Sequence, residues 1–153
     1  MRLPLTGLAL ALIAGCSGLR PYQDESASKN LTIRTNASKV RAELDVHSVD
    51  RQCRAPYIGT VKLDKPTVAV GIPTDAWSYL KFDFASSSLL RGSHGMTKAT
   101  LLRARAGHRY EVDVKYRDDI YDVVVRELSP RGATREVPLL DLASCAKQTI
   151  IGL

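Results

Sequence analysis

The sequence predicts an all-β protein: a single antiparallel β-sandwich domain that follows a signal peptide and a flexible tether. Short segments of alternating apolar and polar residues recur along the chain, and turn-forming residues separate them. This pattern is typical of half-buried strands that pack as two sheets. In addition, no apolar pattern with a 3.6-residue period runs for the length of a helix. A small barrel is the alternative arrangement of the same strands.

The first residues have the features of a secretory signal. Arg2 supplies a positive charge, and the segment Leu8–Ala14 contains no polar residue. This apolar run is too short to span a bilayer, which requires about 20 residues, but it matches the apolar region of a signal peptide. The alternative is a buried N-terminal strand or helix.

The signal ends in a motif that resembles the lipobox of bacterial lipoproteins, Ile13-Ala14-Gly15-Cys16. The resemblance implies cleavage after Gly15, attachment of a diacylglyceryl group to the Cys16 thiol, and fatty acylation of the new Cys16 amine, for example with palmitate. Ser17, rather than Asp, follows the cysteine, so the resemblance favours a periplasm-facing anchor in the outer membrane over the inner membrane or the cell surface.

The lipobox also divides the chain into three parts. We expect a signal peptide over residues 1–15, a lipidated tether over residues 16–30 and a β-sandwich domain over residues 31–153. The segment Ser17–Asn30 is polar, contains Pro21 and carries mixed charges, which is typical of a flexible linker. The remaining domain is long enough to bury a core of its own.

The clearest local prediction is a β-hairpin, with Arg109–Tyr116 and Ile120–Leu128 as its strands. Tyr110, Val112, Val114 and Tyr116 alternate with charged residues, so they should point into the core. Pro138 should place the last strand at a sheet edge. The other segments that we expect to be strands are Leu31–Thr35, Lys39–His47, Tyr57–Leu63, Thr67–Ile72, Trp77–Phe84 and Arg135–Leu140.

The segment Ser86–Gly107 is ambiguous. Gly92 and Gly95 predict a loop in its first half, and "TLLRA" favours a strand over a short helix in its second half. The overlapping segment Leu101–Glu127 is similar to a pattern in small bacterial lipoproteins and carboxypeptidase-regulatory-like modules. This resemblance implies an immunoglobulin- or transthyretin-like sandwich and implies no activity.

The cysteine count fits an oxidising compartment. If Cys16 carries lipid, Cys53 and Cys145 remain as an even pair, and we predict a disulfide between them. A metal site is a weaker alternative, because the two lack the paired spacing of zinc ligands. A reactive cysteine is another alternative, since Arg51 and Arg54 flank Cys53 and would lower the pKa of a thiol.

We expect no catalytic residue, no metal site and no cofactor. The three histidines, His47, His94 and His108, lack metal-ligand spacing. Ser93 precedes His94, but adjacent residues on an extended chain point in opposite directions. Acidic residues gather at the hairpin turn, where they suit turn chemistry better than calcium binding: Asp118, Asp119 and Asp122.

A candidate binding patch lies around one predicted strand end. Its members are basic residues near the "AGHRY" turn and two aromatic residues of another strand: Arg103, Arg105, His108, Arg109, Trp77 and Tyr79. If they gather at one edge of the sandwich, they would form a basic surface with exposed rings. The alternatives are an ordinary solvated face and a second buried face of a central strand.

Charge and composition narrow the function. The chain carries 22 basic and 16 acidic residues, and removal of residues 1–15 takes away only Arg2, which leaves 21 against 16, a net charge of +5. Nucleic acid is disfavoured as a partner because no aromatic–basic recognition pattern appears. We expect a membrane-anchored, non-catalytic binding or scaffolding module with an envelope protein partner, accessory to a multi-protein envelope assembly. One alternative is direct binding of an anionic envelope polymer or lipid, such as peptidoglycan or lipopolysaccharide. A minor hydrolase or redox role is the other.

Overall fold

The computed structural model describes residues 18–26, 28–36, 40–88, 92–117 and 120–147. The expected signal peptide and Cys16 therefore lie outside the described residues, as do Asp118 and Asp119 of the hairpin turn. For Ser93 and His94 only the backbone is described. In the described parts of the chain, no helix is long and apolar enough to cross a membrane.

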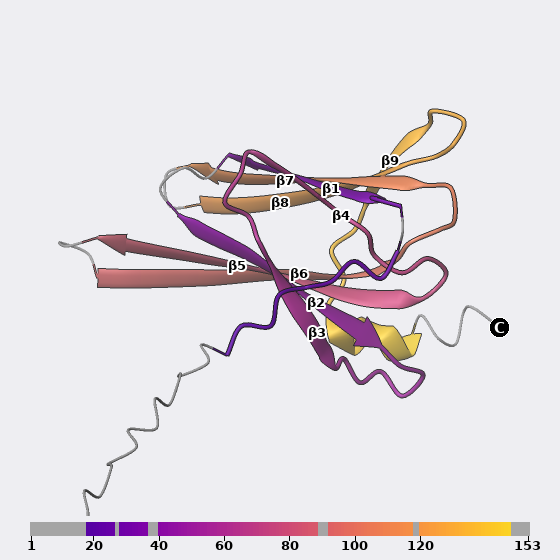
Figure 1. Ribbon diagram of the computed structural model, residues 1–153, viewed down its shortest axis with the longest axis horizontal. Helices are drawn as coiled ribbons and strands as arrows, with labels where there is room; N and C mark the ends of the chain where they lie inside the picture. The colour runs from indigo at the N-terminus through magenta and orange to yellow at the C-terminus, as the bar shows by residue number, and fades with distance from the viewer. Residues whose placement is uncertain (1–17, 27, 37–39, 89–91, 118–119, 148–153) are drawn as a thin grey trace, which may run out of the picture.

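Two packed sheets make up the fold (Figure 1), which confirms the predicted all-β sandwich. One sheet has five strands in the order β4-β1-β7-β8-β9, and the other has four in the order β3-β2-β5-β6. The strands are β1 (Leu31–Asn36), β2 (Arg41–Val49), β3 (Tyr57–Lys62), β4 (Thr67–Val70), β5 (Trp77–Ser88), β6 (Gly92–Arg103), β7 (Arg109–Arg117), β8 (Ile120–Leu128) and β9 (Thr134–Val137).

The core lies between the sheets and uses the alternation that the sequence shows. In the central part of β2, β5 and β7, alternate residues point inward and are almost fully buried. Burial of a large apolar side chain contributes about 1.5–3 kcal/mol relative to exposure, so these alternating positions fix which face of each sheet is internal. The buried inward residues of these three strands are Ala42, Leu44, Val46, Leu80, Phe82, Phe84, Tyr110, Val112 and Val114.

The predicted hairpin is present as β7 and β8, which pair antiparallel from Arg109↔Leu128 to Arg117↔Ile120. On its other side β7 pairs parallel with β1, from Leu31↔Tyr110 to Asn36↔Lys115. This parallel pair departs from the purely antiparallel sandwich that we expected. Parallel neighbours require a long connection, and strands β2–β6 provide one because they lie between β1 and β7 in the chain.

The expected loop around Gly92 and Gly95 is wrong. The strands β5 and β6 form one long hairpin that continues to the pairs Ser86↔His94 and Ser88↔Gly92. The pairing is made by backbone groups, which Gly and Ser supply as well as other residues do. The second half of the same segment is a strand, as predicted.

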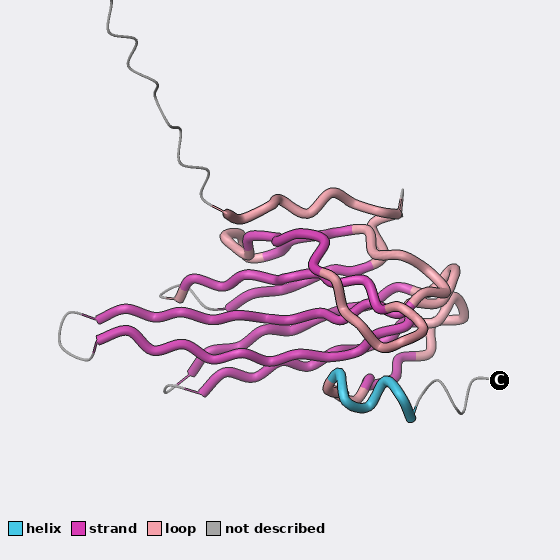
Figure 2. The backbone as a smooth tube through the Cα atoms, turned by 90° about the horizontal axis from the view of Figure 1, so that it is seen from below, coloured by secondary structure: helices cyan, strands magenta, loops and turns pink. Residues whose placement is uncertain are grey.

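Residues 20–26 and 28–30, which we call the strap, lie against the domain (Figure 2), although we expected this segment to be part of a flexible tether. The Tyr22 amide donates to the Thr60 carbonyl (2.9 Å), and the Thr60 amide donates to the Arg20 carbonyl (2.8 Å). The Asn30 side chain donates to the Ile72 carbonyl (2.9 Å) and accepts from the Ile72 amide (2.8 Å). The strap is polar in composition but is bound to the domain, because its polar groups form hydrogen bonds with backbone groups at the sheet edges.

The C-terminal part of the chain crosses from one sheet to the other after β9. The Leu101 amide of β6 donates to the Leu140 carbonyl (2.9 Å), and the short helix η1 (Leu142–Ser144) follows. The structure then joins Cys145 to Cys53, with 5.8 Å between their Cα atoms. This is the disulfide that the sequence predicts, and it ties the crossing segment to the loop between β2 and β3.

Candidate binding cleft

A cleft of about 720 Å³ opens on the side of the sandwich where the edge strands β6 and β9 lie. The segment that follows β9 supplies part of its lining through Pro138 and Leu140. Its walls combine aromatic, aliphatic and basic side chains. The cleft is lined by Asp75, Trp77, Leu101, Leu102, Arg103, Arg105, Ala106, Tyr110, Glu127, Arg135, Val137, Pro138 and Leu140.

A buried carboxylate forms the floor of the cleft. Glu127 on β8 is only 5% exposed. It accepts a hydrogen bond from the Tyr110 hydroxyl on β7 (3.0 Å) and another from Nη2 of Arg135 on β9 (2.5 Å). A buried charge is stable only when it is paired and hydrogen-bonded, and both partners come from strands adjacent to β8.

Two further basic groups approach the same carboxylate. Nε of Arg105 lies 3.8 Å from the Glu127 Oε1, and Nδ1 of His108 lies 2.9 Å from it. The His108 ring is within ion-pair distance but is not aligned for a hydrogen bond. Burial raises the pKa of Glu127, but the hydrogen bonds from Arg135 and Tyr110 and the charges of Arg105 and Arg135 outweigh this effect and hold it below its ordinary value.

Tyr110 connects the floor of the cleft to the turn that follows β6. Its hydroxyl oxygen accepts a hydrogen bond from the Arg105 amide (3.0 Å) and donates to Glu127. Burial raises the pKa of Tyr110, and the neighbouring Glu127 carboxylate adds to this effect. The phenol is therefore a neutral hydrogen-bond donor at any physiological pH and holds the turn that carries Arg105 in place.

Three guanidinium groups remain accessible above this floor. The side chains of Arg105 and Arg135 are 59% and 65% exposed although both contact Glu127. Arg103 is also exposed, and it makes no ion pair with any described residue. It lies directly opposite Trp77 in the β5–β6 pairing. The cleft therefore presents more positive than negative charge, beside one aromatic ring.

The structure brings together part of the patch predicted from the sequence. Trp77, Arg103 and Arg105 line the cleft, and His108 contacts its floor through Glu127. Arg109 is exposed but is not among the residues that line the cleft. Tyr79 does not line it either: its ring lies edge-on against that of His47, with 5.8 Å between centroids.

Sequence reasoning missed three residues of this site: Tyr110 and Glu127 on the floor and Arg135 in the wall. One signal for the floor was visible. Tyr121, Val123 and Val125 face the core, and the same alternation carries Glu127 inward. A carboxylate at an inward position needs buried partners, so it indicates an ion cluster. A second local signal was also available, because β9 follows β8 after a short turn and Arg135 is the direct partner of Glu127 in that antiparallel pair.

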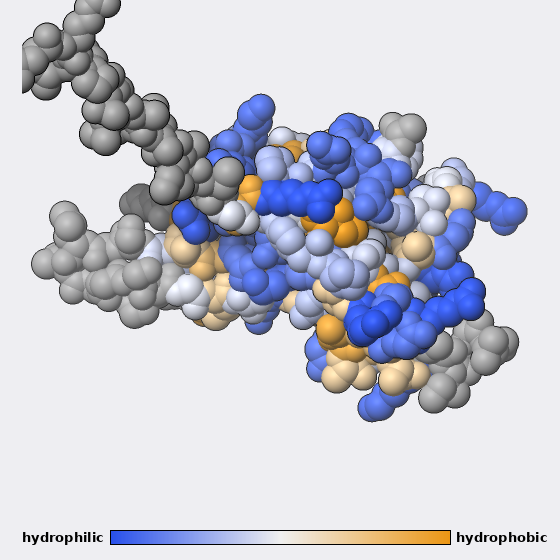
Figure 3. Space-filling model, turned by 60° about the horizontal axis from the view of Figure 1, so that its bottom comes forward, coloured by the Kyte–Doolittle hydropathy of each residue, from blue (hydrophilic) through white to orange (hydrophobic). Residues whose placement is uncertain are grey.

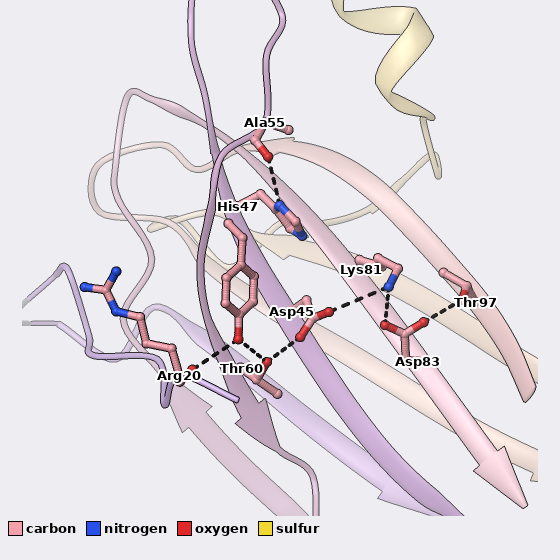
Figure 4. A network of polar contacts seen from close by, with 9 residues as sticks. Arg20, Asp45, His47, Ala55, Thr60, Lys81, Asp83 and Thr97 are labelled. Atoms are coloured by element: carbon pink, nitrogen blue, oxygen red, sulfur yellow. Dashed lines mark hydrogen bonds and ion pairs between the residues drawn. The ribbon is translucent and has the colours of Figure 1, made fainter. Parts of the chain in front are cut away.

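A second polar network covers the outer face of the four-stranded sheet (Figure 4). The Tyr57 hydroxyl lies 2.7 Å from the Thr60 hydroxyl, and Thr60 donates to Asp45. Lys81 bridges Asp45 (3.6 Å) and Asp83 (2.5 Å). The hydrogen bond to Asp83 raises the pKa of Lys81, so this lysine stays charged and paired. Since its members satisfy one another, the network stabilises strand pairing and leaves few groups for a ligand.

The described residues contain no group of three or more His, Cys, Asp or Glu side chains that could hold a metal ion. Chemically, the cleft can bind a group that offers a carboxylate or phosphate to the arginines and an apolar part to Trp77.

No protein-family model, curated protein or solved structure matches this chain. The cleft is therefore the basis for a functional argument.

Proposed function

We propose that this protein is a lipid-anchored, non-catalytic binding module of a bacterial envelope, and that its cleft binds a protein partner. The anchor would be Cys16, in the outer membrane and facing the periplasm. The observation that supports binding is the cleft itself, in which accessible arginines and Trp77 surround a carboxylate that is already neutralised by its neighbours. Tryptophan and arginine are the residues most enriched among the energetically dominant positions of protein interfaces.

A non-catalytic role is favoured by the state of the polar groups in the cleft. Glu127, the buried carboxylate of the floor, is held ionised by hydrogen bonds from Arg135 and Tyr110 and by the charges of Arg105 and Arg135, so it is a poor proton donor or acceptor near neutral pH. Its four contacts serve to position the arginines. The cleft suits an acidic segment of an envelope protein, which would fit an accessory role in a multi-protein assembly.

The binding proposal is tested by crosslinking in cells, followed by purification at moderate salt. Wild type should retain a reproducible partner, and the double substitution Arg103→Ala plus Arg105→Ala should lose it. Arg109→Ala is the matched control, because Arg109 is an exposed arginine outside the cleft. Equal recovery of the partner by all three proteins would show that the cleft is not the binding surface.

A second candidate function is direct binding of an anionic envelope polymer, such as peptidoglycan or lipopolysaccharide. The exposure of three guanidinium groups in one cleft favours it. Sedimentation with purified peptidoglycan or acidic vesicles should then fall as salt rises, because salt screens exposed charges. It should also fall in the double variant. Binding that is insensitive to salt would exclude this function.

The anchor is tested separately. Cys16→Ser should leave an unacylated precursor that does not incorporate labelled palmitate and no longer fractionates with outer membranes. Ser17→Ala is the control and should behave as wild type. If Cys16→Ser fractionates with membranes as wild type does, the anchor proposal is wrong.

A further inference from the structure

The strap is held by contacts along its whole described length. The strap makes two contacts with Gly71 in addition to its bonds to Thr60 and Ile72. The Tyr22 hydroxyl donates to the Gly71 carbonyl (2.8 Å), and the Asp24 carboxylate accepts from the Gly71 amide (3.0 Å). The Asn30 carbonyl accepts from the Tyr110 amide (2.8 Å), and the Asn30 side chain is buried. These contacts reach both sheets, so the strap cannot extend to let the domain move away from its first bound residue.

The first bound residue is Arg20, whose carbonyl accepts from the Thr60 amide of β3. Only residues 17–19 separate it from Cys16. Four peptide units span at most about 14 Å when fully extended. If Cys16 carries lipid, the edge of β3 is therefore held within that distance of the acylated residue.

A bilayer leaflet leaves little room in this interval. The polar headgroup layer is roughly 5–7 Å thick on each side of the hydrocarbon core, so a gap of less than about 10 Å remains above it. A single helix with its side chains is about 10–12 Å wide. No helix therefore fits between the headgroup layer and the edge of β3, and the surface around Arg20 must adjoin the headgroups.

The surface at this point suits lipid headgroups. Leu19 is 48% exposed, and it lines two hollows of about 420 and 270 Å³ beside β3. Arg20 and Lys62 also line the larger hollow, and Arg41 lines the smaller one. Figure 3 shows orange apolar patches among blue side chains on the face that it presents. An exposed leucine among basic groups favours an interface with acidic lipids.

The cleft lies on the other side of the sandwich. The strap binds β3 and the end of β4, which are edge strands, whereas β6 and β9 are the opposite edges of the same two sheets. Figure 2 shows the N-terminal loop along one side of the strands and the C-terminal helical turn on the other. A domain that rests on its β3–β4 side therefore directs the cleft away from the bilayer.

We infer that the strap docks the sandwich on the membrane, with Leu19, Arg20 and Lys62 against acidic headgroups and the Arg103–Arg105 cleft facing away. The inference rests on the lipid anchor of the proposed function and deepens it. The partner surface would then be held at a fixed orientation and about one domain width from the bilayer, instead of moving at the end of a loose tether.

The single tryptophan allows a direct test. Lipidated full-length protein is reconstituted into vesicles of phosphatidylethanolamine and phosphatidylglycerol that contain a lipid with a nitroxide headgroup, which quenches nearby fluorescence. Trp77 in wild type should keep its emission, because it lies in the cleft. In a Trp77→Phe background, Leu19→Trp should lose most of its emission, and Lys62→Trp serves as a second probe if the first variant folds poorly.

A Gly-Ser insertion of about ten residues between Ser17 and Gly18 is the matched control, since it adds roughly 15–20 Å of reach and leaves the strap intact. It should restore most of the emission of the probe at position 19. Quenching of Trp77 as strong as that of the probes would overturn the inference, as would a probe at position 19 that is never quenched. Failure of the protein to associate with vesicles at all would instead overturn the anchor, and the inference with it.

Discussion

Gly71 lies where the strap leaves no room for a side chain. A Cβ atom there would be 2.2 Å from the Ser26 carbonyl oxygen and 2.8 Å from that of Ser28. Gly59 is similarly constrained, because its Cβ would lie 2.6 Å from the Tyr22 Cα. Both neighbours are backbone atoms and cannot rotate away. The strap can therefore pack in this position only because residues 59 and 71 are glycines.

We expect Gly71→Ala to destabilise the protein by about 1–3 kcal/mol, the usual range for overpacking a tight site. Urea unfolding followed by circular dichroism would measure the change. Gly18→Ala is the control, because nothing lies within 4 Å of its Cβ position. Equal unfolding midpoints for the two variants would show that the strap does not pack as described.

Glu127 makes stability dependent on pH. Its pKa is lowered in the folded protein from an ordinary value of 4.5. A depressed folded pKa contributes stability that is present above the unfolded value and is lost as pH falls through the folded value. The wild-type protein should therefore lose stability progressively as pH falls below about 4.5.

Glu127→Gln should remove this pH dependence and lower stability at neutral pH by roughly 1–3 kcal/mol, because Arg135 and Tyr110 lose a charged partner. Thermal unfolding between acidic and neutral pH would measure both effects. Glu136→Gln, on an exposed position of β9, is the control. If Glu127→Gln loses stability on acidification as steeply as Glu136→Gln does, another group is responsible.

At the scale of elements, the strap behaves as an additional edge that joins the two sheets. Tyr22 packs against the core cluster, and burial raises the pKa of its phenol. Truncation of the Tyr22 side chain would remove both its apolar contact with the core and its hydrogen bond to the Gly71 carbonyl. The strap should then open locally up to Lys29, because the contacts that remain before Asn30 are hydrogen bonds that are not fully buried, whereas those of Asn30 are buried.

Tyr22→Ala should therefore increase the rate of tryptic cleavage after Lys29, while the sandwich stays folded. Mass spectrometry of a digestion time course would show it. Tyr22→Phe keeps the ring and loses only the hydroxyl, so its cleavage rate should lie between the other two. Rapid cleavage of the wild type after Lys29 would contradict a docked strap.

At the scale of the whole molecule, the disulfide ties the C-terminal segment that follows β9 of the five-stranded sheet to the β2–β3 loop of the four-stranded sheet. Cys53 and Cys145 are 92 residues apart in sequence. In the chain-entropy model, a crosslink that closes a loop of this length stabilises the fold by about 4–5 kcal/mol. The crosslink holds the crossing segment, including Pro138 and Leu140 of the cleft wall, against β6.

Cys53→Ser plus Cys145→Ser should thus lower stability by up to about 4–5 kcal/mol and also weaken ligand binding in the cleft. Denaturant unfolding of oxidised and reduced wild type provides an independent comparison with the double variant. If reduction leaves the unfolding midpoint unchanged, the disulfide does not restrain the fold.

The sequence by itself determined the strands, because burial on one side of a sheet imposes a period of two. Alternation located the β7–β8 hairpin and the segments that form β2 and β5, and the count of cysteines indicated the pair Cys53 and Cys145. Alternation did not locate the end of the β5–β6 hairpin. The strands pair there through backbone groups, and the Gly and Ser residues show no apolar alternation.

Only the tertiary structure decided where the chain's polar residues lie. The strap is polar in composition and is bound because sheet-edge groups of Thr60, Gly71 and Ile72 need partners. The cleft exists because Glu127, Tyr110 and Arg135 meet across β7, β8 and β9. The strap contacts depend on long-range closure, and the cleft contacts depend on the register of neighbouring strands. Neither is encoded in the local period of a sequence.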